Sequence, residues 1–197
     1  MGQLVIRAAI QGVRTVTYKG FLLGLGIALL GALPAKADLI IKANGTTIAS
    51  SVNNDAAWFS GDIGGFNANI VSTFGVDLFG GNGVLMDNGS INVSTAGVGT
   101  LLLEFIQTDL TSSAPALSFG VSFTGNIVGA SVVRSFYADA TNAGLAATLL
   151  GSTTVGNATF TSAPVALSGL FSLTEVISIT ALAPGAFLSA DDTVTVP

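Results

Sequence analysis

Apolar and polar residues alternate along most of the chain from residue 38 onward. The clearest example is residues 117–124 (LSFGVSFT), where an apolar side chain occupies every second position up to Phe123. A period of two directs one row of side chains into a core and the other into water. Apolar residues at helical spacing are rare in this region. The pattern therefore predicts an all-β chain.

Turn chemistry separates the predicted strands. Asn-Gly pairs at 44–45, 82–83 and 88–89 favour hairpin turns, because these residues tolerate positive φ. Pro115, Pro164 and Pro184 indicate later boundaries. Residues 142–150 have fair helix propensity and are compatible with a helix or a strand. Besides 117–124, the predicted strands are 39–43, 46–52, 66–74, 90–95, 100–108, 127–138, 158–161 and 173–181.

The N-terminus has a different pattern. Basic residues precede a 13-residue apolar run at 21–33, which ends at Pro34 and the small-residue motif Ala-Lys-Ala at 35–37. A membrane-spanning helix needs about 20 apolar residues. Residues 1–37 therefore predict a signal peptide that is cleaved after Ala37, and a secreted mature chain without a membrane span.

The 160 residues that follow are enough for one domain with a substantial core. Many short strands at this spacing suggest an antiparallel β-sandwich over residues 38–197. A jelly-roll-like arrangement is preferred, and an immunoglobulin-like topology is the alternative.

The mature chain is strongly acidic. Cleavage after Ala37 leaves two cations, Lys42 and Arg134, against all eleven carboxylates, a net charge of −9. Such a surface cannot neutralise phosphates, which argues against nucleic acid and anionic membranes as partners. A carbohydrate, a cation or another protein remains compatible with this charge.

The catalytic options are few. The chain contains no His and no Cys, which excludes catalytic triads, imidazole bases and the usual zinc sites. Glycoside hydrolysis needs only two carboxyl groups, and the mature chain has two glutamates, Glu104 and Glu175. Both lie in strand-like runs, where an ion pair with Arg134 on or near the sheet is the preferred interpretation. The sequence therefore nominates no catalytic residue.

Two weaker sites can be named. Calcium takes oxygen ligands, although the aspartates form no EF-hand. Trp58 and Phe59 could form an aromatic platform for a sugar ring, but Trp58 is expected to be a buried anchor. The candidate calcium ligands are Asp55, Asp62, Asp77, Asp87, Asp191 and Asp192. For three of these aspartates a structural role is the alternative to calcium binding: a turn at 87–90 and a polar connection at 191–192.

The signal peptide, the cysteine-free domain rich in Ser, Thr, Gly and Asn, and residues 171–179 (FSLTEVISI) together resemble PEP-CTERM proteins of Gram-negative bacteria. In that family a Val-Pro-Glu-Pro motif, an apolar helix and a basic tail direct sorting by exosortase. Val196 and Pro197 match the first half of that motif, and residues 191–194 resemble its usual lead-in. The remaining parts of that sorting signal are absent from this sequence. The resemblance implies a cell-surface or matrix protein associated with polysaccharide production, and no particular ligand.

Three functions remain open. The favoured one is a non-enzymatic surface or extracellular-matrix protein, able to self-assemble through strand edges that lack charged residues. The second is a carbohydrate-binding module of a polysaccharide or biofilm matrix. The third is a glycoside-active enzyme that uses Glu104 or Glu175 with an aspartate.

Overall fold

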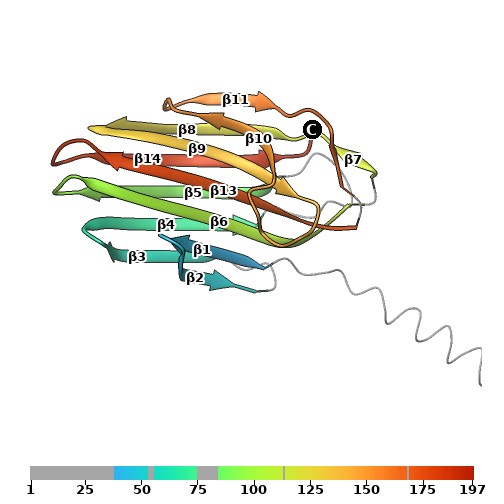
Figure 1. Ribbon diagram of the computed structural model, residues 1–197, viewed down its shortest axis with the longest axis horizontal. Coiled ribbons are helices and arrows are strands. Elements are labelled where there is room, and N and C mark those ends of the chain that lie inside the picture. Colours follow the sequence, from blue (N-terminus) through green and yellow to red (C-terminus); the bar gives the residue numbers. More distant parts are fainter. Residues whose placement is uncertain (1–37, 53–55, 75–83, 113, 168) are drawn as a thin grey trace, which may run out of the picture. The chain divides into compact units, whose positions relative to one another are not determined.

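The computed structural model describes residues 38–52, 56–74, 84–112, 114–167 and 169–197. Two six-stranded antiparallel sheets pack face to face, and a third sheet contains only β7 (Ala116–Leu117) and β12 (Val165–Ala166). Figure 1 shows the two layers. Sheet A has the order β10 (Thr148–Thr153), β9 (Ala130–Asp139), β13 (Gly169–Ala181), β6 (Gly99–Ser112), β1 (Leu39–Ala43) and β2 (Thr46–Ser51). Sheet B has the order β11 (Ala158–Thr161), β8 (Gly120–Val128), β14 (Phe187–Thr195), β5 (Val84–Thr95), β4 (Phe66–Phe74) and β3 (Ala57–Ile63).

Several connections lead the chain directly from one sheet to the other. The connections β5 to β6, β8 to β9 and β13 to β14 each carry the chain from one sheet to the other. The all-β antiparallel sandwich predicted from the alternation is confirmed. None of the described residues is helical, so none forms a helix that could cross a membrane.

The core lies between the sheets and follows the alternation. On β8, Val121 and Phe123 are fully buried while Ser122 and Thr124 face outward. Phe119, just before this strand, is also buried and contacts Phe171 of β13, with ring centroids 6.4 Å apart. Burial of these apolar faces is the main stabilising contribution in a chain without cysteine.

Two predicted turns have different outcomes. The pair at 44–45 forms the hairpin between β1 and β2, with positive φ at both Asn44 and Gly45. The turn predicted at 88–89 is wrong, because β5 runs through it. There the chain forms a bulge, with φ of 78° at Ser90 and a register shift against β14. The Asn-Gly pair therefore lies within a bulged strand, and the strand continues past it. The pair at 82–83 lies outside the described residues.

Three other boundaries differ from the predictions. The run 127–138 is interrupted at Gly129, whose positive φ ends β8 and lets β9 begin in the other sheet. Residues 142–150 contain no helix, and β10 begins at Thr148. The polar connection predicted at 191–192 is wrong, because both aspartates lie inside β14. The strands β3, β12 and β14 had not been predicted. In β14 the buried Asp192 interrupts the alternation of apolar and polar residues.

Candidate functional site

The outer face of sheet B carries mostly polar side chains, with a few exposed apolar ones such as Val84 and Val128. Alternation on its strands directs most apolar residues inward and leaves mainly short polar side chains, three of them aspartates, outside. Within the described chain, Lys42 belongs to sheet A and Arg134 to the core, so no cation lies on this face. Its exposed residues include Ser60, Asp62, Asn67, Asn69, Ser90, Asn92, Ser94, Asn126, Thr124, Ser189 and Asp191.

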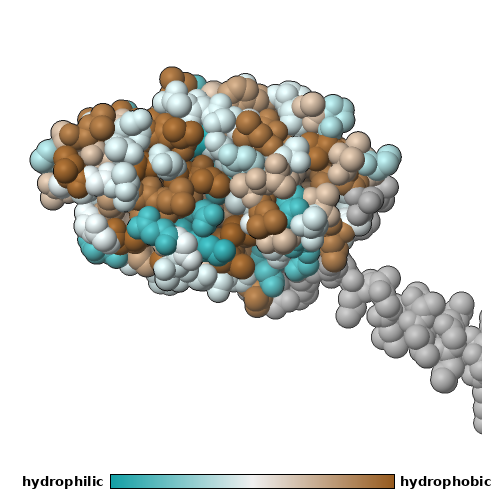
Figure 2. All heavy atoms as spheres, in the orientation of Figure 1, coloured by the Kyte–Doolittle hydropathy of each residue, from teal (hydrophilic) through white to brown (hydrophobic). Residues whose placement is uncertain are grey.

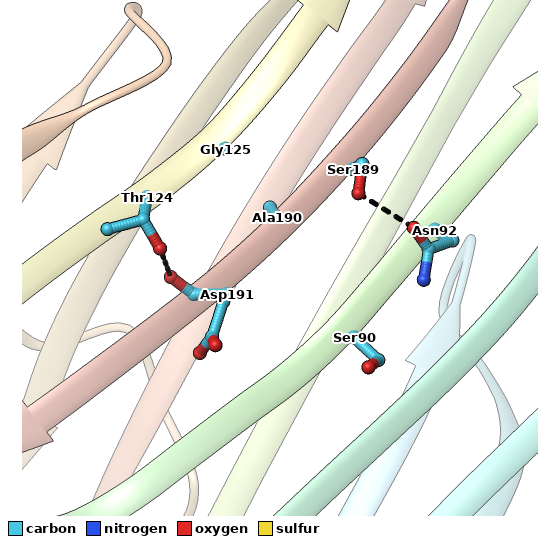
Figure 3. A pocket seen from close by; sticks show the side chains of 7 residues that line it. All are labelled: Ser90, Asn92, Thr124, Gly125, Ser189, Ala190 and Asp191. Carbon is cyan, nitrogen blue, oxygen red and sulfur yellow. Dashed lines mark hydrogen bonds between the residues drawn. The ribbon is translucent and has the colours of Figure 1, made fainter.

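A shallow pocket of about 250 Å³ lies on this face, where β5, β14 and β8 run side by side. The Ser189 hydroxyl donates to Asn92 Oδ1 over 2.8 Å, and the Thr124 hydroxyl donates to the Asp191 carbonyl over 2.6 Å. Figure 3 shows the amide nitrogen of Asn92 directed away from Ser189. That amide and the Asp191 carboxylate are therefore available to a ligand. The pocket is lined by Ser90, Asn92, Thr124, Gly125, Ser189, Ala190 and Asp191.

Two carboxylates converge beside this pocket. A Cβ placed on Gly89 would lie 3.3 Å from Asp87 Oδ1 and 4.0 Å from Asp191 Oδ1, so the glycine leaves the space between them open. Burial, and then the nearby charge of Asp191, raise the pKa of Asp87 above its ordinary value. This corner of the face therefore repels anions.

Trp58 lies on the same face and is 70% exposed, so the expectation that it is a buried anchor is wrong. It pairs with Val71 of β4, next to the register shift between β4 and β5. From the β5 bulge a row continues through Gly89 and Asp191 to Thr124. Four strand spacings of about 4.8 Å separate Trp58 from Thr124, or about 19 Å. Phe59 points to the opposite side and packs against the core, so any platform on this face contains Trp58 alone.

A group of polar side chains is buried in the core beneath the pocket. Arg134 of β9 pairs with Asp192 of β14 over 2.6 Å, and both side chains are 0% exposed. Glu175 of β13 accepts a hydrogen bond of 2.5 Å from the Asn88 amide, and Asn88 accepts one from the Ser72 hydroxyl. The ion pair expected for Arg134 is therefore present, but its partner is Asp192 and neither of the two glutamates. The facing strand supplies that partner, and sequence patterns do not show which strands face each other.

Glu175 and Asp192 share this low-dielectric environment. Burial, followed by repulsion from Asp192, raises the pKa of Glu175 well above its ordinary value, and burial also raises the pKa of Asp192. Glu175 Oε1 and Asp192 Oδ2 have no other hydrogen-bond partner, and the two carboxyl groups are close enough to hydrogen-bond each other. The two oxygens are therefore placed to share one proton, and the pair with one proton carries a single negative charge opposite Arg134.

The two glutamates cannot act on one glycosidic bond. Glu104 pairs with Val176, the residue after Glu175, so the two carboxyls lie on opposite faces of sheet A. Glu175 is fully buried, and its nearest acid, Asp192, is buried with it. Glycoside hydrolysis needs two accessible carboxyl groups on either side of a cleft. The two glutamates do not form such a pair.

The candidate calcium ligands are dispersed. Asp62 is exposed on β3 and accepts a hydrogen bond from Gly65, Asp87 and Asp191 lie on the polar face, and Asp192 is in the core. Asp55 and Asp77 lie outside the described residues. Among the residues that the structure describes, no three acidic side chains are grouped closely enough to hold a metal ion.

The pocket residues other than Asp191 had not been nominated from the sequence. Their signal was present, because Ser90, Asn92 and Ser94 occupy alternate positions, as do Ser122 and Thr124. The pattern shows which residues face outward, but the adjacency of β5, β14 and β8 depends on long-range strand order.

No family model matches the chain, and no curated protein matches it. Among solved structures, the enzymatically active domain of tailspike protein 4 from bacteriophage CBA120 is 15% identical, with a TM-score of 0.37 over 73% of this chain and 19% of that one. The adhesin domain of Epf from Streptococcus pyogenes is 8% identical, with a TM-score of 0.37 over 84% of this chain and 59% of that one. The chain thus spans less than two thirds of either protein, and these likenesses say nothing about what it binds.

Proposed function

We propose that this chain is an exported, non-enzymatic protein of the cell surface or extracellular matrix, and that the outer face of sheet B binds a neutral polysaccharide. The observation that supports this most is the exposed indole of Trp58 on the same outer face as the polar pocket. An indole offers a flat apolar surface to the ring of a sugar, while hydroxyl, amide and carboxylate groups bond its hydroxyls.

The charge of the face supports a neutral ligand. Asp62, Asp87 and Asp191 lie on it, and no cation among the described residues accompanies them. An anionic polysaccharide would meet like charges, which opposes both encounter and binding. From Trp58 to the pocket this face spans about 19 Å across the strands, which suits an extended chain of several sugars better than a single ring.

The test compares polysaccharide binding by the purified protein and by Trp58 variants. Affinity electrophoresis against soluble neutral and acidic polysaccharides would identify a ligand, and calorimetry would measure its affinity. We expect Trp58→Ala to weaken binding of a neutral polysaccharide about tenfold or more, because an aromatic contact contributes about 1.5–3 kcal/mol. Trp58→Phe should retain part of the affinity.

Leu102→Ala is the matched control, since Leu102 is also exposed but lies on the outer face of sheet A. It should bind like the unchanged protein. Absence of binding to every neutral polysaccharide, or equal affinity in Trp58→Ala, would exclude the proposed role of this face.

A second candidate function, self-assembly, is favoured by the edge strands. The edges β2 (TTIASS), β10 (TLLGST) and β11 (ATFT) contain no charged residue. Charged side chains on an edge normally prevent strand addition by another molecule. Light scattering over a range of protein concentrations should then reveal growing assemblies, and replacing the exposed Ser50 of β2 with Lys should reduce them. A monomer at every concentration would contradict this candidate.

A further inference from the structure

Arg134 reaches from sheet A to the backbone that forms one side of the pocket. Its Nη1 donates to the Thr124 carbonyl over 3.1 Å as well as to Asp192. Its Nη2 donates to the carbonyls of Val155 and Gly156 over 2.9 and 2.6 Å. The guanidinium also stacks on Phe123, 5.3 Å from the ring centroid. One side chain therefore joins the pocket strand β8 to the loop between β10 and β11.

Asp192 completes the support of the same backbone. Its Oδ1 accepts a hydrogen bond of 3.3 Å from the Thr124 N–H. The next N–H, that of Gly125, donates to Asn157 Oδ1 over 3.1 Å. Both polar backbone groups of Thr124 are thus bonded to side chains whose charges are buried, while its hydroxyl bonds the Asp191 carbonyl on the surface.

These contacts lie where β8 has lost its backbone pairing with β11. The pairing of β11 with β8 ends at Phe123, so Thr124 and Gly125 have no strand partner on that side. The loop approaches closely there, since a Cβ on Gly156 would lie 2.5 Å from the Gly125 carbonyl oxygen. The polar group in the core thus replaces the absent strand at the point where β8 lines the pocket.

A purely structural purpose explains this arrangement poorly. Burying two charges costs desolvation energy, and apolar residues of similar size often stabilise a core as well or better. The guanidinium instead holds three carbonyl groups in fixed directions, which no apolar side chain can do. We propose that Arg134, together with Asp192, is a positioning residue for the pocket on sheet B, holding Thr124 and Gly125 where a bound glycan requires them. This inference rests on the function proposed above.

The experiment separates positioning from general stability. Arg134→Met, Arg134→Lys and the control Leu103→Ala would be compared for polysaccharide affinity and for amide hydrogen exchange at Thr124 and Gly125. Leu103 is fully buried in the apolar core of β6, so its truncation destabilises the fold without touching the pocket. Arg134→Lys keeps the charge beside Asp192 but cannot bond all three carbonyls, and it tests the idea if Arg134→Met does not fold.

We expect both Arg134 variants to lower affinity about tenfold and to speed exchange at the two amides at least tenfold, while Leu103→Ala keeps its affinity. Unchanged exchange in the Arg134 variants, or an equal loss of affinity in Leu103→Ala, would overturn the proposal. If the unchanged protein binds no polysaccharide, the proposed function fails, but the exchange rates still show whether Arg134 positions this backbone.

Discussion

The outer faces of the two sheets follow the same alternation but differ in what covers them. Sheet B presents mostly short polar side chains that remain exposed, together with Trp58 and two exposed valines, Val84 and Val128. Sheet A presents apolar groups such as Leu102 and Val133, which are 37% and 41% exposed. Figure 2, with sheet A in front, shows brown apolar patches between teal polar ones.

Part of sheet A is also covered by its own chain. Gly144, in the loop between β9 and β10, contacts Ile106 of β6 closely enough that Ile106 is buried although it faces outward. Asp139 holds this loop by accepting hydrogen bonds from the backbone of Thr141, Ala143 and Leu145. Burial alone would raise the pKa of Asp139, but these bonds and one from the Thr141 hydroxyl outweigh it and lower the pKa.

The comparison shows how one strand pattern serves two purposes. Outward positions of sheet A contribute to packing, because a loop crosses them and buries part of their surface. Outward positions of sheet B stay accessible, and their polar groups remain available for hydrogen bonds to a ligand. The accessible face is the one that carries the pocket and the exposed indole.

The largest expected effect comes from adding a methyl group on each face. Gly144 has φ of 68°, and a Cβ there would lie 2.6 Å from Ile106 Cγ2, so Gly144→Ala should lower the free energy of unfolding by about 2–4 kcal/mol. At Gly89 the nearest atom is Oδ1 at the end of the Asp87 side chain, 3.3 Å away, so Gly89→Ala should change the free energy of unfolding by less than about 0.5 kcal/mol. Urea denaturation measures both.

Equal free energies of unfolding for Gly144→Ala and Gly89→Ala would contradict the distinction between the covered face of sheet A and the open face of sheet B. A large effect of Gly89→Ala alone would mean that the polar face is the more tightly packed one. Polysaccharide binding adds a second comparison, since Gly89→Ala narrows the space between Asp87 and Asp191 while Gly144→Ala lies on the opposite face.

The fold class could be predicted because alternation is a local property. The strands 39–43, 66–74 and 158–161 agree with the structure to the residue. Strands that carry polar groups into the core or glycines within the ladder could not be recognised in this way. In β5 and β14, the buried Asn88 and Asp192 break the alternation because each is satisfied by a partner on another strand.

The candidate site was less predictable for a related reason. Trp58 was recognised as an aromatic candidate, but its exposure depends on its position in an edge strand. The partnership of Arg134 with Asp192 joins residues 58 positions apart across two sheets. Contacts of this kind follow from strand order and sheet packing, neither of which a single sequence determines.

A smaller effect per pH unit concerns the dependence of stability on pH. It distinguishes Glu175, which lies beneath the polar face, from Asp139, which holds the loop that covers sheet A. The folded chain retains the Glu175 proton above pH 4.5, the ordinary pKa at which an unfolded chain releases it. Unfolding in that range releases a proton, so stability should fall as pH rises, by at most about 1.4 kcal/mol per pH unit, until folded Glu175 itself ionises. Asp139, whose pKa is lowered, has the opposite effect and loses its contribution only as pH falls.

Glu175→Gln isolates this contribution, because an amide can accept the bond from Asn88 and donate to Asp192 without a titrating proton. Urea denaturation at pH 5, 7 and 9 should show a decline in the unchanged protein that is flattened in the variant. Parallel curves would mean that Glu175 is already ionised in the folded chain. A flat curve for the variant would instead assign the loss of stability at high pH to Glu175, which lies beneath the polar face next to the pair of Asp192 with Arg134.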